Sequence, residues 1–549
     1  MKRRLFFTVL LFLAVFLFWW LAYPHALSYQ EQNQLFLLSG DYLCERLSLP
    51  GGLADYLGEG ITQFFLIPWL GALLLAVVFV SLQYFTWRVT RPSFMDASVI
   101  TAPHDHSPAP CPLPPAPIYF FSFIPSILLL WHLGDESVLL SYPVALVLTL
   151  AAVCLVCRRR MWIDIIVLPL LYWCVGPVAW LYVLLRVLHL GWKGCWQLLY
   201  MPVILVVANA LLTQWPTQMV LWGLNYYRTP LMLPSLQIII PVVIFLLAVL
   251  AKWSGGILHG SLATAVSLCA LGVLAFFAVN NGFDADKYEL IRQDYLIRNE
   301  RWDDIIERAE KKVVKTPFWS QSVNLALAMR RQLAERQFDF FQSGEDALFM
   351  PMLRDQTSDL PTAEAFWHLG MVNSAQRYMF DLQESILNYR KSGRFTRRIA
   401  ECMIVNGQYE GAAKQLNILK KTLFYHAWAE EAEAYLYHDE KVMTHPVWGR
   451  QRQLRYKDSF LYNYPEIDKM LGQLFMNNPQ NKMALDYFLA QLLLKGDVPG
   501  FMQYLGLAQR YGGYQQMPAG YQDAVRCIQS RGNLPGSPYA DYVKRMTGN

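Results

Sequence analysis

Long apolar runs fill the first half of the chain and stop near residue 280. The first run, Leu5–Tyr23, directly follows three basic residues and is too long for the apolar core of a cleaved leader. Similar runs follow at Thr62–Phe85, Ile118–Leu133, Val138–Cys157, Trp162–Cys174, Val178–Leu190, Trp196–Leu212, Leu236–Trp253 and Leu262–Val279. Because a helix satisfies its backbone polar groups within one segment, such runs form helices in lipid. The pattern predicts a bundle of about nine transmembrane helices.

The two runs on either side of Gly176-Pro177 leave the number of spans open. As a single helix, Trp162–Leu190 would be about 43 Å long at about 1.5 Å per residue, which is more than a bilayer core of about 30 Å needs. As two helices, each is short and has to tilt or be re-entrant. A turn at Gly176-Pro177 places Arg186 and Lys193 on the side that carries most other basic residues, which favours two helices.

From Phe283 onward the apolar positions follow a helical period with frequent turn residues. Breaks at Asn299–Trp302, Asn406–Tyr409 and Lys495–Val498 each separate two helical segments, as in proteins built from repeated helical hairpins. The unit that most resembles a tetratricopeptide repeat contains Ala400, Met403, Gly407, Tyr409, Ala412 and Leu416. The predicted fold class is therefore all-α: a polytopic transmembrane domain at 1–280 and a tetratricopeptide-like α-helical-hairpin repeat domain at 283–549.

The distribution of charge supports the same division. Residues 1–280 contain 10 acidic and 13 basic side chains, so 32 of the 42 acidic and 34 of the 47 basic side chains belong to the remainder. A water-soluble domain could not be so poor in charge over 280 residues, and lipid is the expected solvent of the first half. The net charge of +5 gives no reason to propose nucleic-acid binding.

Basic residues also predict the orientation of the spans. With nine spans, eleven basic residues lie on one side, namely Lys2, Arg3, Arg4, Arg88, Arg91, Arg158, Arg159, Arg160, Arg186, Lys193 and Lys252. The opposite loops contain two, Arg46 and Arg228. Since basic residues concentrate in cytoplasmic loops, we expect a cytoplasmic amino terminus and an extracytoplasmic carboxy-terminal domain.

The first extracytoplasmic loop, Pro24–Gly60, contains the candidate catalytic residues. Leu27, Leu35, Leu38 and Tyr42 suggest one helix that lies along the membrane surface with Glu31 and Gln34 on its polar side. A carboxylate held at this interface can act as a general base toward an acceptor hydroxyl, so Glu31 is the first candidate and Asp41 the second. The alternative is a solvated interfacial helix without a chemical role.

Arg228 is the candidate for substrate binding in the later loop Trp215–Pro234. An arginine fork pairs with phosphate oxygens, and the preceding Tyr227 can shield that contact from water. Arg46 is the other basic residue on this side of the membrane. The alternative for Arg228 is an anchor that snorkels beside a belt of aromatic residues.

Other polar motifs carry less weight. Cys154-x-x-Cys157 lies within an apolar run, and His104-Asp105-His106 lies in a polar, proline-rich linker without further ligands at a suitable spacing. We therefore predict neither a metal site nor a cofactor. Asp164 and His189 lie near predicted cytoplasmic ends of spans, where we expect them to be interfacial.

The layout resembles the C-type glycosyltransferase superfamily of membrane enzymes, in which an acidic residue lies early in the first extracytoplasmic loop. Glu31 matches that position, and Asp41 is a poorer match. The resemblance implies a sugar donor carried on a polyprenyl phosphate, with Glu31 as base and Arg228 and Arg46 as phosphate ligands.

The segments Ser28–Gln34 and Gly40–Tyr42 also resemble an uncharacterised family of Bacteroidota polytopic membrane proteins, which implies a bacterial inner membrane and a periplasmic carboxy-terminal domain. The competing function is a membrane-anchored scaffold that binds envelope proteins and catalyses nothing. Transport is disfavoured because the spans contain almost no charge.

Overall fold

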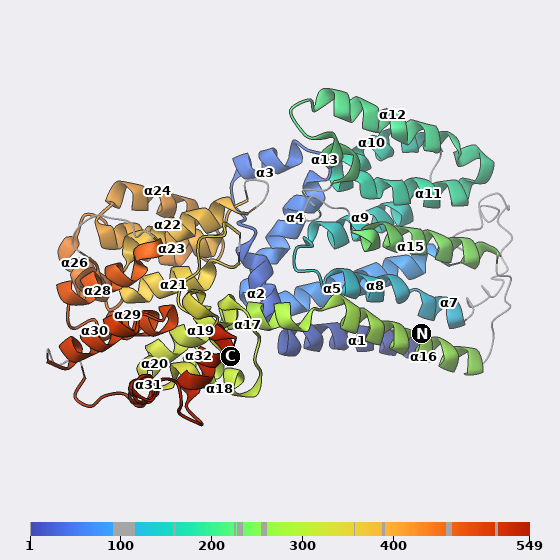
Figure 1. Cartoon of the computed structure of the whole chain (residues 1–549). Coiled ribbons are helices and arrows are strands. Elements are labelled where there is room, and N and C mark those ends of the chain that lie inside the picture. Colours follow the sequence, from blue (N-terminus) through green and yellow to red (C-terminus); the bar gives the residue numbers. More distant parts are fainter. Residues whose placement is uncertain are drawn as a thin grey trace. The chain divides into compact units, whose positions relative to one another are not determined.

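The computed structural model describes residues 2–91, 116–156, 161–223, 227, 234–253, 261–355, 357–386, 390–456, 464–510 and 514–548. Within these residues the secondary structure is helical and contains no strand, so the predicted all-α class is confirmed. The chain divides into two compact units, Met1–Ala285 and Asp286–Asn549, which we call the N-terminal and C-terminal units (Figure 1).

The N-terminal unit opens with one long helix and three short ones. Helix α1 (Lys2–Leu17) continues as a π-helical turn, η1 (Phe18–Ala22). The next segment folds as α2 (Pro24–Gln32), α3 (Gly40–Leu47) and α4 (Gly52–Thr62), and η2 (Gln63–Leu66) leads into α5 (Pro68–Val89). The later helices are α7 (Ala116–Phe121), α8 (Ile124–His132), α9 (Ser141–Val156), α10 (Asp164–Val175), α11 (Ala179–Leu190), α12 (Trp196–Leu211), α13 (Thr217–Trp222), α15 (Ser235–Trp253) and α16 (Ser261–Gly282).

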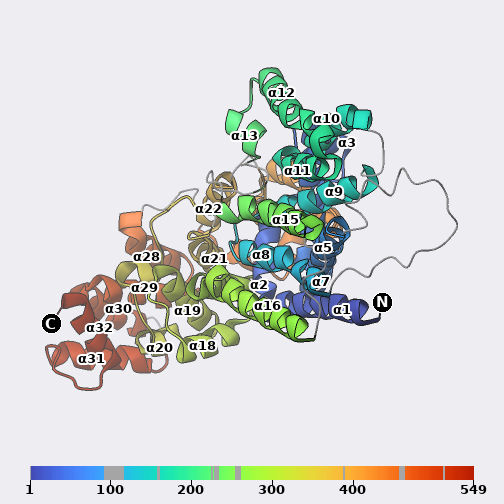
Figure 2. The same cartoon turned by 90° about the vertical axis from the view of Figure 1, so that its right-hand side faces the viewer.

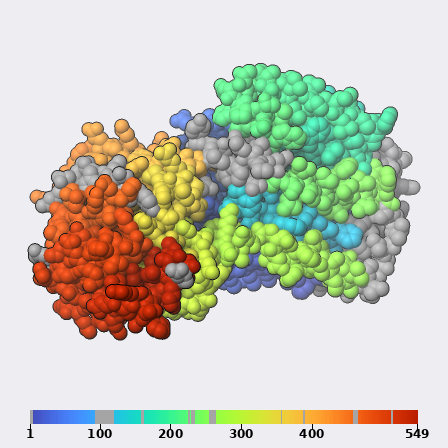
Figure 3. Space-filling model, in the orientation of Figure 1, coloured from blue at the N-terminus to red at the C-terminus, as the bar shows by residue number. Residues whose placement is uncertain are grey.

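Apolar side chains cover the outward surface of these helices. Within the described residues, five helical segments are long and apolar enough to cross a membrane: Arg4–Ala22, Pro68–Val89, Met161–Gly194, Ser235–Trp253 and Thr264–Gly282. Three shorter apolar helices accompany them. Helices α12, α15 and α16 are visible on the face shown in Figure 3. Leu199 and Val206 of α12 and Phe276 of α16 are exposed. Such a surface is consistent with a membrane protein, because apolar side chains are better solvated by lipid than by water.

The chain reverses direction at Gly176, so the apolar segment on either side of it forms two helices, α10 and α11. Gly176 has a φ of +62°, a backbone conformation that favours glycine, and it ends α10. In a continuous helix, Asp164 and Tyr182 would lie about 27 Å apart along the axis. Instead, the Tyr182 hydroxyl donates to Asp164 Oδ1 over 2.5 Å, so α11 folds back against α10. The nine predicted segments are all helical where they are described. That each crosses the membrane stays a prediction.

The C-terminal unit consists of helices, many of which pack against the next helix along the chain. The pairs α18–α19, α21–α22, α22–α23, α23–α24, α28–α29 and α29–α30 are all in contact. Its helices are α17 (Ala285–Arg298), α18 (Trp302–Lys311), α19 (Pro317–Met329), α20 (Leu333–Arg336), α21 (Leu360–Leu369), α22 (Val372–Glu384), α23 (Gly393–Asn406), α24 (Tyr409–Leu419), α25 (His426–Glu433), α26 (Asp439–Thr444), α27 (Trp448–Leu454), α28 (Ile467–Asn477), α29 (Lys482–Lys495), α30 (Val498–Arg510), α31 (Ala519–Gln529) and α32 (Pro538–Thr547). Gly370, Gly407 and Gly496 end their helices in the left-handed conformation, which closes the tight turns between neighbours.

Candidate functional site

The loop after the first span places one arginine over a buried carboxylate. Arg46 Nε lies 3.1 Å from Glu59 Oε2, and Arg46 also donates to the Tyr42 hydroxyl over 3.0 Å. That hydroxyl in turn donates to Glu59 Oε2. The Glu59 side chain is 1% exposed, whereas that of Arg46 is 16% exposed, so part of the guanidinium reaches the surface. We call Tyr42, Arg46, Asp55 and Glu59 the loop cluster.

Local sequence explains why these side chains meet. Tyr42 and Arg46 are four residues apart on α3, and Asp55 and Glu59 are four apart on α4, so each pair shares one helix face. Between the helices Gly51 adopts a φ of +82°, and a Cβ on Gly52 would collide with the backbone of Arg46. Two glycines therefore let α3 and α4 approach closely enough for the loop cluster to form.

Electrostatics keep Arg46 charged. Burial alone would lower its pKa, but the charge of Glu59 and the nearby Tyr42 and Asp55 raise the pKa of Arg46 above its ordinary value. The second carboxylate, Asp55, is 5% exposed and accepts a hydrogen bond of 2.7 Å from the Ser141 hydroxyl at the start of α9. The loop cluster is thus a permanent cation beside two buried carboxylates.

Several turns of the N-terminal unit gather at this end of the helices. Gly51 N donates to Trp173 O over 2.8 Å, and Leu139 N donates to Tyr227 O over 3.0 Å. The Tyr227 hydroxyl donates to Val175 O. In the nine-span prediction all these turns lie on the extracytoplasmic side, and the structure brings them together.

The structure places the predicted site residues in different environments. Arg46 belongs to the loop cluster. Asp41 is exposed in the first turn of α3. Tyr227 is fully buried, which raises the pKa of its hydroxyl. Arg228 lies outside the described residues. Glu31 lies near the end of α2 and is 1% exposed.

The prediction of one surface helix carrying Glu31 and Gln34 on its polar side is wrong. Residues 33–39 separate α2 from α3, and both Glu31 and Gln34 are buried. Sequence reasoning also missed Asp55 and Glu59, which the structure brings to Arg46 where Glu31 and Asp41 were expected to act. Their spacing of four residues in the same loop was the available signal.

Asp164, which was expected near a membrane interface, is buried among side chains of the N-terminal unit. Its carboxylate accepts hydrogen bonds from Arg186 Nε (2.9 Å), Gln197 Nε2 (2.7 Å) and the Tyr182 hydroxyl. Both Asp164 and Arg186 are 0% exposed. Arg186 is therefore the partner of a buried acid rather than a loop charge. In the part of the chain that the structure describes, the apolar helices thus contain a fully buried ion pair, which the sequence did not lead us to expect.

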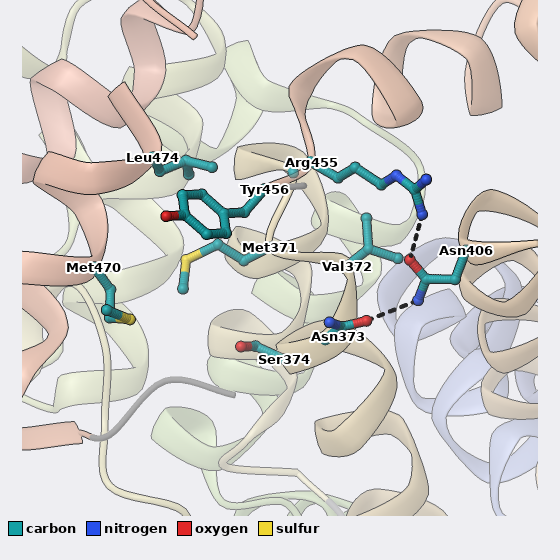
Figure 4. Close-up of a pocket in the computed structure, with 10 residues that line it drawn as sticks. Met371, Val372, Asn373, Ser374, Asn406, Arg455, Tyr456, Met470 and Leu474 are labelled. Atoms are coloured by element: carbon teal, nitrogen blue, oxygen red, sulfur yellow. Dashed lines mark hydrogen bonds between the residues drawn. The ribbon is translucent and has the colours of Figure 1, made fainter. Parts of the chain in front are cut away.

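A small cavity in the C-terminal unit is too small for a ligand. It measures about 30 Å³ and lies between the start of α22 and the segment around Tyr456 (Figure 4). That volume suits about one water molecule. Arg455 donates to Asn406 Oδ1 over 3.3 Å, and Asn406 Nδ2 donates to Asn373 Oδ1 over 2.9 Å, so its polar side chains are joined to one another.

Comparison with known proteins gives one match. A family model described as "Family of unknown function (DUF6057)" matches residues 1–544. No curated protein and no solved structure matches the chain.

Proposed function

The chain belongs to DUF6057, a family of unknown function, and we propose that it is an integral membrane glycosyltransferase whose sugar donor is a polyprenyl phosphate. The reaction takes place at the extracytoplasmic face of a bacterial inner membrane. The amino terminus is cytoplasmic, and the C-terminal unit is a periplasmic, tetratricopeptide-like domain. The observation that supports this proposal best is the loop cluster, because a partly exposed and permanently charged arginine suits a lipid-linked phosphate.

Each residue has a distinct task in this proposal. Arg46, with Arg228, binds the phosphate and stabilises the charge that develops on it as the sugar leaves. Glu59 already accepts from Arg46 and Tyr42, so it anchors the arginine and is a poor base. Glu31 removes the proton from the acceptor hydroxyl, whose oxygen then bonds to the sugar while the polyprenyl phosphate departs. Asp41 is the less favoured base.

The test uses a deletion strain complemented with variants of the full chain. Glu31→Gln keeps the size of the side chain but cannot accept the proton, so we expect activity to fall by about two to four powers of ten. Arg46→Lys should weaken use of the donor because an ammonium cannot reproduce the guanidinium fork. The readouts are the surface glycans and the pool of lipid-linked sugars, both measured by mass spectrometry.

Glu440→Gln is the matched control, since it makes the same chemical change as Glu31→Gln at an exposed side chain of the C-terminal unit, outside the loop cluster. It should restore glycans to the wild-type level. Full rescue by both Glu31→Gln and Arg46→Lys, at wild-type protein level, would contradict the transferase proposal.

A non-catalytic scaffold for envelope proteins is the second candidate. The size of the C-terminal unit favours it, because almost half of the chain is a helical domain outside the apolar spans. A scaffold would tolerate changes in the loop cluster and would lose function when surface residues of the C-terminal unit change. Two results together would support this alternative. Envelope proteins would co-purify in equal amounts with the wild type and with Glu31→Gln, and Glu31→Gln would fully rescue the deletion strain.

A further inference from the structure

The C-terminal unit contains a cavity of about 390 Å³ whose charged lining is mainly arginine. It lies among α17, α21, α23 and α27, and five arginines but three glutamates line it. The volume falls within the range of small-molecule sites, about 300–1,000 Å³. A cavity with more fixed cations than carboxylates is electrostatically suited to an anion.

One part of the wall is a closed ion network. Glu364 lies 3.3 Å from Arg394 and 3.0 Å from Arg398, and Arg394 also pairs with Asp294 at 2.7 Å. Burial alone would raise the pKa of Glu364, but Arg398 and Arg394 lower it to about 2. Glu364 therefore stays ionised and holds the two arginines in place.

Other arginines of the wall keep hydrogen-bond donors available. Arg397 uses Nε on Glu401 (3.3 Å) and stacks over Trp428, with its guanidinium 4.6 Å from the ring centre. Its two terminal amino groups make no hydrogen bond to any residue that the structure describes. Arg450 is exposed and forms no ion pair with a described residue. Stacking fixes the plane of a guanidinium and leaves its edge free to bind an anion.

The cavity also contains a buried acceptor that lacks a donor. Gln451 lines the cavity and is 3% exposed. Its Oε1 has no hydrogen-bond partner among the described residues. Because a buried acceptor without a partner is costly, Gln451 gains a hydrogen bond when its amide turns toward the cavity and accepts from a hydroxyl or an N–H group of a ligand.

We propose that this cavity binds a small organic anion that carries hydroxyl groups, namely a sugar bearing a phosphate or a carboxylate. The anionic group binds the edges of Arg397 and Arg450, and a hydroxyl donates to Gln451 Oε1. The site lies wholly within the C-terminal unit, so the proposal does not depend on the transferase activity.

The test measures binding to the full-length protein in lipid nanodiscs by calorimetry. Glucose 1-phosphate and glucuronate are the two anionic sugar probes. Glucose, which lacks the anionic group, and inorganic phosphate, which lacks the sugar, are the two partial probes. We expect at least one anionic sugar to bind at least tenfold more tightly than both partial probes. Binding of both anionic sugars indicates a shared anion subsite, and binding of glucose 1-phosphate alone indicates a phosphate subsite.

Variants assign that binding to the cavity. Arg397→Gln and Arg450→Gln should each weaken binding of the anionic sugar at least tenfold, and both alter side chains at the surface, so folding is preserved. Gln451→Leu should remove the advantage of the sugar phosphate over inorganic phosphate. Arg301→Gln is the control, because Arg301 is 55% exposed and does not line the cavity.

Three results would overturn the proposal. The first is that neither anionic sugar binds at millimolar concentration. The second is that Arg397→Gln and Arg450→Gln bind as well as Arg301→Gln. The third is that a peptide with several carboxylates displaces the sugars and binds more tightly, which would assign the cavity to an acidic protein segment.

Discussion

Buried charge is arranged differently among helices α10 to α12 of the N-terminal unit and around the large cavity of the C-terminal unit. In the N-terminal unit, Asp164 and Arg186 form one pair, and Tyr182 and Gln197 also donate to the carboxylate. In the C-terminal unit, Arg394, Arg397 and Arg398 share Glu364 and Glu401 beside a cavity, so arginine donors remain after the carboxylates are used. The number of unused donors distinguishes a buried ion pair that only stabilises the fold from one that can also bind a ligand.

Breaking the pair in the N-terminal unit should have the largest effect. Asp164→Leu leaves Arg186 buried without its carboxylate, and we expect a loss of about 3–5 kcal/mol of stability. The measurement is the yield and thermal unfolding of the detergent-solubilised protein. The double variant Asp164→Leu/Arg186→Met removes both charges and should recover most of that loss. If Asp164→Leu is as stable as the wild type, the ion pair contributes little to the stability of the fold.

The corresponding change in the C-terminal unit is Glu364→Gln. The pKa of Glu364 is lowered from about 4.5 to about 2 in the folded state, so its stabilising effect is fully present above pH ~4.5 and is lost as pH falls toward 2. We expect the variant to be less stable by roughly 3 kcal/mol at pH 7 and to approach the wild type near pH 2. Hydrogen exchange of α21 and α23 at several pH values measures this. A difference that does not change with pH would contradict it.

His368 reinforces the same dependence on pH. Burial lowers its pKa from 6.5 to about 4, so the folded state binds fewer protons than the unfolded state between these values. Stability from this group is present above pH 6.5 and is lost as pH falls toward 4. The C-terminal unit should therefore begin to lose stability in mild acid, at a pH above that at which protonation of Glu364 adds to the loss.

Asp486 differs from Glu364 in that it is a buried carboxylate without an arginine partner among the described residues. Burial raises its pKa to about 6, and its Oδ1 accepts a hydrogen bond of 2.6 Å from the Tyr514 hydroxyl. Ionising it in the folded state is costly above pH 6, so Asp486→Asn should stabilise the protein by about 1–3 kcal/mol at pH 7.5. The gain should vanish below pH ~4, where Asp486 is already neutral. Thermal unfolding at both pH values is the measurement, and a destabilised variant at pH 7.5 would contradict this expectation.

A change far from any ion pair gives the smallest effect and sets the scale for the others. Gly407 has a φ of +74° with no atom within 4 Å of an added Cβ, so Gly407→Ala costs about 1 kcal/mol of backbone strain. Gly506 lies inside α30 with equally open space, and Gly506→Ala should instead stabilise by about 0.5–1 kcal/mol. Denaturant unfolding distinguishes the two signs. Equal effects would show that the turn tolerates a side chain.

The sequence predicts those features that depend on neighbouring residues. The turns at Gly407 and Gly496 are where the helical period breaks, and both glycines adopt the left-handed conformation. The break at Gly176 could also be proposed, since glycine and proline stand together within an apolar run. Helix class and turns follow from such local patterns.

Side-chain partners could not be predicted in the same way. Asp164 and Arg186 are 22 residues apart and meet because α11 folds back on α10. Arg46 and Glu59 meet because Gly51 and Gly52 allow a close approach of two short helices. The burial of Glu31 likewise depends on packing around α2, which a hydropathy pattern does not contain.

Two glycines in the N-terminal unit have a consequence for the order of biosynthesis. An added Cβ on Gly134 would collide with the backbone of Gly282, and one on Gly282 would lie 2.8 Å from Trp131 O, so the ends of α8 and α16 meet backbone to backbone (Figure 2). The ribosome makes α8 about 130 residues before it makes α16. The end of α8 must therefore wait for the last apolar helix to insert. The C-terminal unit follows directly in the chain, so its first helices are synthesised before or while the N-terminal unit makes this contact.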